Sequence, residues 1–301
     1  MKSSERKLHM TIDVNQPTPQ SAKVHPWLFL GLTLSLTWAV GFSAAAACDY
    51  LPGWGITALQ YLGGVIPLVV SVALVYRIHN QPFQRDFWRR ILDFRRIGFV
   101  WYLMIFLYAP VKSGLAALVD FLLGGQGMVP EAAKLFIEQP LFILPTLLFW
   151  LFFGPIPEEP GWRGYALDGL QARHSALLAS LFVGVVWSLW HIPLFFIDGT
   201  WQADQIGFGT QRFWLFQLTM VIEAVLYTWI YNNTNRSTLS AILFHFVGNA
   251  FGELFELSAR AEVYNFLIGL AVVLLVIGIW GPKKLTRKRT TVVQNANWKA
   301  R

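Results

Sequence analysis

The sequence has little of what a soluble or secreted domain relies on. Only 14% of its 301 residues are charged, and it has a single cysteine, Cys48. One cysteine excludes an intrachain disulfide and leaves the redox compartment open. We find no internal repeat, no low-complexity linker and no second soluble domain. The period-two alternation of a transmembrane β-barrel is also absent, which excludes that class.

Apolar residues dominate the chain instead, since 55% of the residues are hydrophobic and 16% are aromatic. A membrane-spanning helix needs about 20 mostly apolar residues. Eight runs meet this requirement, at residues 27–47, 56–76, 97–122, 135–158, 175–197, 213–231, 238–257 and 263–281. The predicted fold is therefore all-α, a polytopic membrane helical bundle with about eight transmembrane helices. The first run is longer than the roughly 7–15 apolar residues of a signal peptide core, so no cleaved signal is expected.

Basic residues gather in alternate loops. They precede the first span, follow the second, fourth and sixth, and are dense after the eighth, whereas the opposite loops hold only Lys134, Arg212 and Arg260. The positive-inside rule then predicts a multi-pass protein of the bacterial plasma membrane with both termini cytoplasmic. The predicted organisation is a cytoplasmic tail at 1–26, a transmembrane domain at 27–281 and a basic cytoplasmic tail at 282–301. The basic tail favours anionic lipids as partners over nucleic acid.

Ionisable residues are costly within a membrane, and PIPEEPGWRG (155–164), directly after an uncharged run, places two carboxylates between prolines and an arginine three residues after the last proline. Pro157 and Pro160 interrupt the helical hydrogen bonds, so protein or water must satisfy the freed groups. Glu159 and Arg163 are four residues apart and can pair on one helix face, which leaves Glu158 facing elsewhere. The alternative is that this segment is merely the interfacial end of a span, with its charges among the headgroups.

Three further polar residues lie in later apolar runs. His191 stands in the fifth run, and His245 and Asn249 share a face of the seventh at a spacing of four. Each alone is compatible with an ordinary interhelical hydrogen bond. If residues 171–175 form a helical hairpin, Glu158 and His191 reach similar heights at about 1.5 Å per residue. Lys112, Asp120 and Glu223 are interpreted as interhelical partners or cavity-lining groups, and Glu223 is the one to test for a substrate or proton role.

These side chains would form a plausible hydrolytic centre if they converge. A buried carboxylate and a histidine can take a proton from water, which then attacks a carbonyl carbon. A second histidine and the Asn249 carboxamide can donate hydrogen bonds to the developing oxyanion, which is most effective where water is scarce.

The same residues carry a resemblance to a known family. EEPGWR (158–163) matches the EExxxR signature, His191 lies in WSLWHIP, and HFVGN (245–249) matches HxxxN. In this order they resemble the intramembrane CAAX-protease and bacteriocin-processing (CPBP) family, over about residues 140–255. The second motif is usually FxxxH, and here Trp187 replaces the phenylalanine, which we interpret as a change in the pocket.

The resemblance implies an intramembrane endopeptidase that acts on a membrane-associated, prenylated or bacteriocin-like substrate. Glu158 and His191 would activate water, His245 and Asn249 would line the oxyanion side, and Glu159 and Arg163 would hold the segment in shape. Family descriptions often name a metalloprotease, and Glu158, His191 and His245 could bind zinc. No HExxH helix is present, however, and we favour a metal-free mechanism.

Two other classes of protein remain compatible with the sequence. A transporter would also keep intramembrane charges and broken helices, but it would tend to show paired half-repeats, which are not found here. A non-catalytic membrane immunity or binding protein could retain the same motifs as scaffold.

Overall fold

The computed structural model describes residues 12–13, 24–286 and 291–292. The tails predicted at 1–26 and 282–301 therefore lie mostly outside the described residues. The long helices are α1 (Pro26–Ala46), α2 (Gly53–Ile78), α4 (Phe99–Leu122), α9 (Ala176–Trp190), α10 (Gln211–Asn233), α11 (Thr238–Leu254) and α12 (Ala259–Trp280). The shorter helices are α3 (Gln81–Leu92), α5 (Glu131–Glu138), α6 (Ile143–Phe152), α7 (Pro155–Gly161) and α8 (Leu167–Gln171).

Short helical turns and strands complete the elements. The turns are η2 (Phe94–Arg96), η3 (Pro140–Phe142), η4 (Trp162–Ala166), η5 (Ile192–Phe196) and η6 (Gln202–Ile206), of which η4 and η6 are π-helical. The strands are β1 (Ile12–Asp13), β2 (Met128–Val129), β3 (Glu256–Leu257) and β4 (Thr291–Val292). Two antiparallel pairs, β1 with β4 and β2 with β3, are the only sheets among the described residues.

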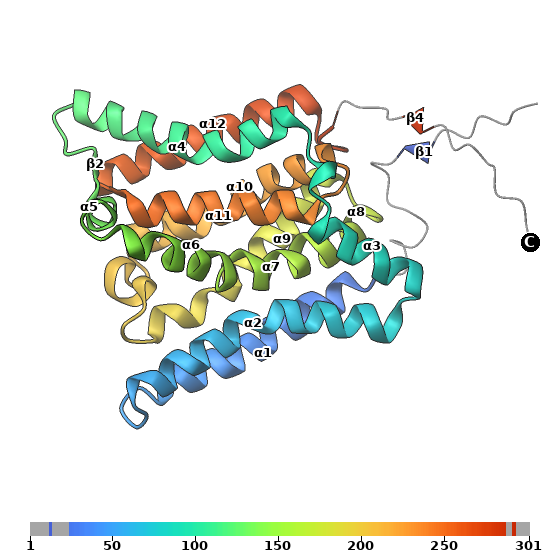
Figure 1. Cartoon of the computed structure of the whole chain (residues 1–301), viewed down its shortest axis with the longest axis horizontal. Helices are drawn as coiled ribbons and strands as arrows, with labels where there is room; N and C mark the ends of the chain where they lie inside the picture. Colours follow the sequence, from blue (N-terminus) through green and yellow to red (C-terminus); the bar gives the residue numbers. More distant parts are fainter. Residues whose placement is uncertain (1–11, 14–23, 287–290, 293–301) are drawn as a thin grey trace, which may run out of the picture.

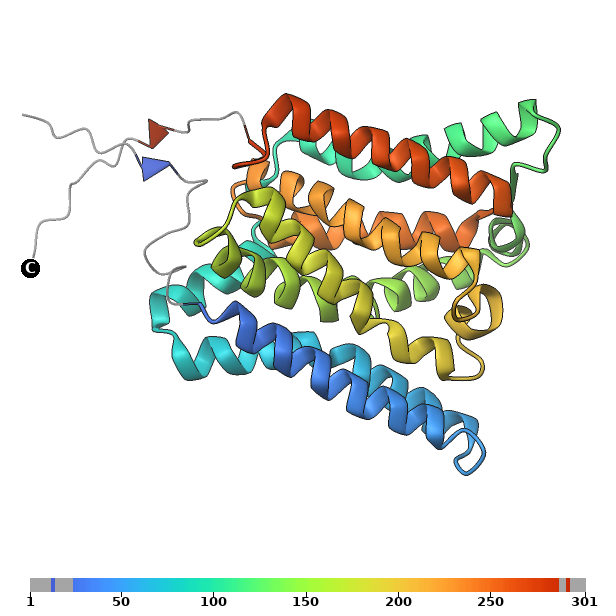
Figure 2. The same cartoon turned by 180° about the vertical axis from the view of Figure 1, so that it is seen from behind.

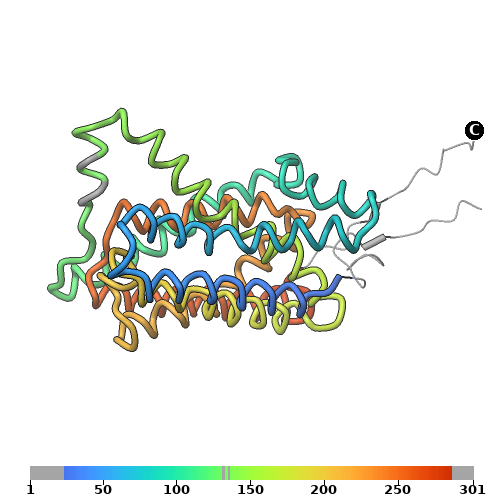
Figure 3. Tube along the Cα trace, turned by 90° about the horizontal axis from the view of Figure 1, so that it is seen from below, coloured from blue at the N-terminus to red at the C-terminus, as the bar shows by residue number. Residues whose placement is uncertain are grey.

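The predicted polytopic helical bundle is confirmed. Within the described part of the chain, seven helical segments are long and apolar enough to cross a membrane. The 17-residue helix α11 adds an eighth candidate, because it extends about 26 Å at 1.5 Å per residue. None of the residues of α6 is buried, as expected for a helix that faces lipid. Figure 3 shows α6 leaning away from the neighbouring helices.

The fourth predicted span differs from the structure. The prediction ended a continuous helix at residue 158, whereas the structure contains a broken apolar helical segment over Pro140–Gln171. Proline at the start of a helix costs little, because the first N–H groups have no intrahelical partner. The chain therefore restarts at Pro155 and continues through α7, η4 and α8. The two glutamates consequently lie inside this helical segment, where both are buried by protein.

The helices pack with α7 in the interior. The pair α1 and α2 flanks one side, α4 and α12 flank the other, and α7 contacts both α2 and α11 (Figures 1 and 2). The hairpin predicted at 171–175 is present, because α8 ends at Gln171 and Ser175 caps α9 through a hydrogen bond from the Leu178 amide. The main buried core surrounds η4, where Trp162 and Tyr165 are completely buried.

The basic loops meet at one end of the bundle. The Ala176 amide donates to the Lys283 carbonyl at 2.8 Å, and the Asn235 side chain donates to the Arg96 carbonyl at 3.0 Å. Arg173 reaches the Val24 carbonyl at 3.3 Å. At the other end, Asp120 binds Arg260 and holds the turn before β2. The loops that are rich in basic residues in the sequence thus lie together at one end of the folded molecule.

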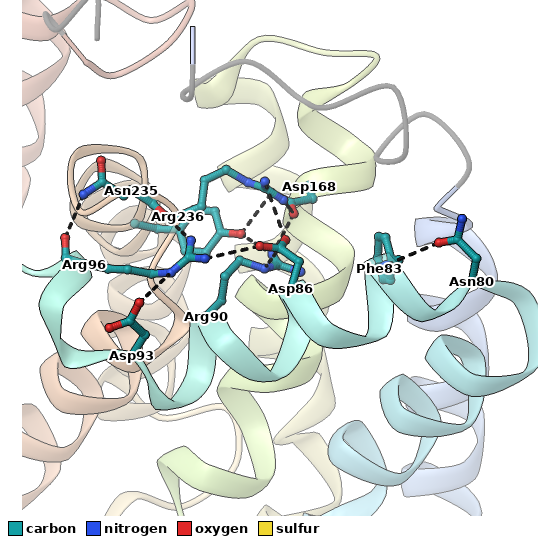
Figure 4. A network of polar contacts seen from close by, with 10 residues as sticks. Asn80, Phe83, Asp86, Arg90, Asp93, Arg96, Asp168, Asn235 and Arg236 are labelled. Atoms are coloured by element: carbon teal, nitrogen blue, oxygen red, sulfur yellow. Dashed lines mark hydrogen bonds and ion pairs between the residues drawn. The ribbon is translucent and has the colours of Figure 1, made fainter. Parts of the chain in front are cut away.

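A buried polar network anchors α8 at the basic end (Figure 4). Asp168 binds Arg90 of α3 at 2.7 Å and accepts a second ion pair from Arg236. Tyr231 donates to Asp168 at 3.0 Å. Asn235 and Arg236 both adopt the left-handed conformation, with φ of 53° and 57°, which is uncommon for arginine. The ion pair with Asp168 offsets this strain and ties α3, α8 and α10 together.

Candidate active site

The segment that carries the two glutamates is a short helix between two breaks. Gly154 precedes it with φ −125° and ψ −96°, and Pro155 occupies its first position. Pro160 lacks an N–H and cannot donate to the carbonyl four residues earlier. The π-helical turn η4 follows directly, and such turns are frequent at functional sites. The prolines of the motif thus set where the regular helix stops and restarts.

Close packing explains the glycine that follows Pro160 in the motif. A Cβ atom on Gly161 would lie 2.6 Å from Cζ of Phe29 and 2.8 Å from the carbonyl oxygen of Pro67. Both distances are shorter than van der Waals contact, and one involves backbone that cannot move aside. Only glycine allows α1 and α2 to approach α7 this closely.

Glu159 is the fixed carboxylate of the pair. Arg163 donates to both of its oxygens, at 2.8 and 2.9 Å, so the predicted pair is present. Nδ1 of His245 lies 2.9 Å from Oε1 of Glu159, a contact that the spacing did not predict. Glu159 is 0% exposed and Arg163 is 1% exposed. The ion pair therefore joins α7, η4 and α11 in a place that water does not reach.

Two aromatic rings hold the guanidinium of Arg163. Its Cζ atom lies 4.6 Å from the ring centroid of Trp187 and 4.0 Å from that of Tyr227. A guanidinium is attracted to the faces of such rings, and more strongly where water is excluded. The rings come from α9 and α10, so Arg163 connects these helices to the motif segment.

Glu158 faces away from the ion pair, as its position next to Glu159 predicted. Its Oε2 accepts a hydrogen bond of 2.7 Å from Nε1 of Trp187, and it is 6% exposed. Nδ1 of His191 lies 2.9 Å from the backbone carbonyl of Trp187. Trp187 therefore links the two residues, because its indole N–H binds Glu158 and its backbone carbonyl binds His191.

The rings of His191 and His245 both lie next to the ring of this tryptophan. Their centroids are 6.0 Å and 5.4 Å from the Trp187 ring. Glu158, His191 and His245 thus each lie against Trp187, and no direct hydrogen bond joins the three within the described residues.

Asn249 lies one helical turn beyond His245. The helices α7 and α11 run antiparallel, so His245 lies beside Glu159 and Asn249 lies near Gly154, where its Nδ2 is 3.3 Å from the position a Cβ would take. Asn249 is exposed, and it makes no hydrogen bond with any described residue. Its carboxamide is therefore free to contact a ligand, one turn away from Glu158.

The buried charges require a proton for neutrality. Two buried carboxylates, Glu158 and Glu159, lie in the same segment as one buried guanidinium, that of Arg163, and His245 contacts Glu159. Unbalanced charge is costly in such a place. One additional proton balances the charge of the site. Because these groups interact, the proton is shared by the set of groups and is not assigned to one residue. A shared proton of this kind is what acid–base chemistry needs.

The hypothetical zinc ligands do not form a recognisable metal site. In the described part of the chain, no three His, Cys, Asp or Glu side chains come close enough together to hold a metal ion. This includes Glu158, His191 and His245. The chemistry considered below uses only side chains of this protein.

Several features of the site had no clear signal in the sequence. The donor role of Trp187 was missed because a tryptophan in an apolar run is usually packing, although it stands four residues before His191 on the same helix. Tyr227 lies one turn after Glu223 and was not singled out. Lys112 and Glu223 were correctly interpreted as interhelical partners, because they pair with each other.

Fold and site together define a class of protein. The chain is a multi-pass helical membrane protein with a buried acid–histidine centre on a proline-broken helix. The sequence profile of type II CAAX prenyl endopeptidases (Rce1-like) matches residues 140–251. This interval begins at η3 and ends within α11, so it contains every residue of the candidate site.

A relative extends the similarity beyond that interval. CAAX prenyl protease 2 from Methanococcus maripaludis is 29% identical over 262 residues, which cover 84% of this chain and 95% of the relative. Both comparisons show similarity to CAAX proteases, because the matched profile and the relative are each described as a protease of this kind. This similarity supports intramembrane endopeptidase activity.

Proposed function

We propose that this protein hydrolyses a peptide bond of a membrane-associated substrate with a water molecule that Glu158 and His191 activate. The observation that carries the proposal is the contrast between the two neighbouring carboxylates. Both oxygens of Glu159 accept from Arg163, and one also contacts His245. Glu158 accepts only from Trp187, through Oε2, and its Oε1 accepts nothing from the described residues. Glu158 is therefore the carboxylate with capacity to bind and deprotonate water.

His191 is oriented for proton transfer. A carbonyl oxygen can only accept, so Nδ1 of His191 donates to the Trp187 carbonyl. In the neutral imidazole this leaves Nε2 with a lone pair. Nε2 can then take a proton as water attacks and deliver it to the leaving amine.

His245 is oriented for the oxyanion side. Its Nδ1 donates to Glu159, which fixes the orientation of the ring. An imidazolium presents Nε2–H to a developing negative charge, and the free carboxamide of Asn249 offers a second donor. Donors that are fixed before the reaction are worth most where water is excluded.

The substrate class follows from the relative's name. Because the Methanococcus relative is named a CAAX prenyl protease, we propose that the substrate ends in a CAAX sequence with a prenylated cysteine, and that the protein cuts the bond after this cysteine to release the last three residues. The lipid-facing helix α6, which directly precedes α7, suits a substrate that arrives through the bilayer. A bacteriocin-like precursor is the alternative substrate.

We also propose that the protein lies in the bacterial plasma membrane with both termini in the cytoplasm. The support is the gathering of basic loops at one end of the bundle. Reporter fusions at residues 26 and 127 would test this, with cytoplasmic and external signals expected, respectively.

The decisive experiment compares wild type, Glu158→Gln and Glu138→Gln in liposomes. Glu138 is an exposed carboxylate outside the site and serves as the matched control. A fluorescent peptide with a C-terminal prenylated CAAX sequence is the first substrate, and an unprenylated copy and an acyl-anchored peptide are the others. Wild type and the control should cleave the prenylated peptide, with the cut located by mass spectrometry, and Glu158→Gln should not. Equal cleavage by all three proteins would contradict the role of Glu158, and absence of cleavage by all would favour a non-catalytic binding or immunity protein.

A further inference from the structure

A second polar site lies at the corner between α2 and α4, away from the glutamates. A cavity of 860 Å³ opens there along α3 and η2. Its wall is formed mainly by arginine and aromatic side chains, namely Tyr76, Arg85, Trp88, Arg89, Arg95 and Arg96. Nothing in the proposed peptidase chemistry uses this cavity.

The cavity has an excess of positive charge. Four arginines line it, and Asp93 is the only acidic residue in its wall. Arg96 is engaged, since it contacts Asp86 at 3.3 Å and Asp93 at 3.8 Å. Arg85 and Arg89 are exposed and form no ion pair with any described residue. Arg95 also forms no ion pair in the described part of the chain, but its guanidinium lies over the Phe94 ring, 5.7 Å from the centroid. Arg85 and Arg89 are therefore the guanidinium groups most available to an anion.

The surroundings place this cavity at a membrane surface. It lies between the end of α2 and the start of α4, both of which are membrane-spanning helices. Phe94, which stands between Asp93 and Arg95 of the wall, and Phe99 at the start of α4 are 60% and 76% exposed, which suits contact with acyl chains. Nε1 of Trp88 donates to the hydroxyl of Tyr76 at 3.1 Å, so two aromatic residues of the kind found at bilayer interfaces form one wall.

We propose that this cavity binds the phosphate headgroup of an anionic phospholipid. Arginine suits a phosphodiester because its guanidinium can donate two parallel hydrogen bonds. Arg85 and Arg89 hold the phosphate, and Tyr76, Trp88 and Leu92 contact the glycerol and the first carbons of the acyl chains. A lipid fits better than a soluble phosphate because Leu92 in the wall and Phe94 next to it in sequence are 72% and 60% exposed, which offers apolar surface to acyl chains beside the arginines. This inference does not depend on the proposed peptidase activity.

The cavity is connected to the rest of the bundle. Arg96 and Arg90 both contact Asp86, and Arg90 binds Asp168 of α8. A lipid bound across α3 and η2 holds this network in place. We therefore expect occupancy to raise the temperature at which the whole protein unfolds.

The test uses the full chain with Arg85 and Arg89 both replaced by glutamine. Because both side chains are exposed, the fold should survive, which equal unfolding temperatures in phosphatidylcholine would confirm. The matched control replaces Arg77 and Lys283, exposed basic residues at the same end outside the cavity, by glutamine. Native mass spectrometry and thermal unfolding then measure binding of dioleoylphosphatidylglycerol against dioleoylphosphatidylcholine, with glycerophosphoglycerol as the soluble headgroup.

Wild type and control should prefer phosphatidylglycerol, and the Arg85/Arg89 variant should bind it about tenfold more weakly. Three results would overturn the proposal. Wild type could show no preference between the two lipids, the control could lose as much affinity as the variant, or the soluble headgroup could stabilise the protein as strongly as the lipid. The last result would assign the cavity to a soluble phosphate compound instead.

Discussion

Nδ1 of His245 lies 2.9 Å from Oε1 of Glu159, and the adjacent Glu158 has no such partner. Two identical side chains at successive positions therefore have different surroundings. Glu159 is saturated by Arg163 and His245, whereas Glu158 receives one hydrogen bond from Trp187. This difference predicts that substitution of Glu158 mainly affects activity, whereas substitution of Glu159 mainly affects stability.

Replacing Glu158 by glutamine should abolish turnover and leave the fold intact. Glutamine has the same shape, and its carbonyl oxygen can still accept from Trp187. Loss of a general base typically costs about 10²- to 10⁴-fold in rate. Kinetics on a membrane-tethered peptide and a thermal melt of the same preparation check both parts.

Replacing Glu159 by glutamine should instead lower the stability of the folded protein. It leaves the buried guanidinium of Arg163 without a countercharge, and breaking a buried pair in this way costs about 3–5 kcal/mol. The melting temperature of Glu159→Gln should fall well below that of Glu158→Gln. Matching melting temperatures would contradict the division of roles between the two carboxylates.

Trp187 should tolerate phenylalanine better than alanine. Phenylalanine removes the hydrogen bond to Glu158 but keeps a ring beside Arg163. A hydrogen bond to a charged group contributes about 1.5–3 kcal/mol to stability, so phenylalanine should lower the melting temperature moderately, and activity should fall because Glu158 loses the donor that holds it in place. Alanine should lower both further, because it also leaves a cavity. If phenylalanine destabilised the protein as much as alanine, the ring contact with Arg163 would not be the reason.

Replacing Asp168 by asparagine should destabilise the protein without any direct effect on catalysis. Arg90 and Arg236 would both lose their main countercharge, at a cost of about 3–5 kcal/mol. Asp93→Asn is the control, because its half-exposed pair with Arg96 at 3.8 Å is worth only about 0–1 kcal/mol. Thermal unfolding in detergent should separate the two variants clearly, and similar curves would show that the network adds little stability.

Local pattern predicted the helices and the identity of the polar motif residues. The spans follow from apolar length, and the pairing of Glu159 with Arg163 follows from a spacing of four on one helix. Contacts between distant segments were not predictable in this way. The approach of His245 to Glu159 depends on the antiparallel register of α7 and α11, and no local rule sets this register.

The continuation of the fourth span was missed for a related reason. Proline normally ends a helix, so the pattern indicated an end at residue 158, but Pro155 at a helix start and the π-turn at η4 let the chain continue. The network around Asp168 was not predicted, for the same reason, because Asp168 lies beyond residue 158, where the fourth span was expected to end. Its partners Arg90 and Arg236 were interpreted only as loop charges that set orientation.

Removal of metal should leave activity unchanged. Glu158, His191 and His245 do not come together as a set of metal ligands among the described residues, and the proposed proton transfers need none. Protein dialysed against a strong chelator should retain its rate, and elemental analysis of the active preparation should find less than one equivalent of zinc per chain. Addition of zinc to this preparation should not raise the rate. Loss of activity on dialysis with recovery on adding zinc would contradict the metal-free mechanism, and zinc content that falls in His191→Ala and His245→Ala would then identify the ligands.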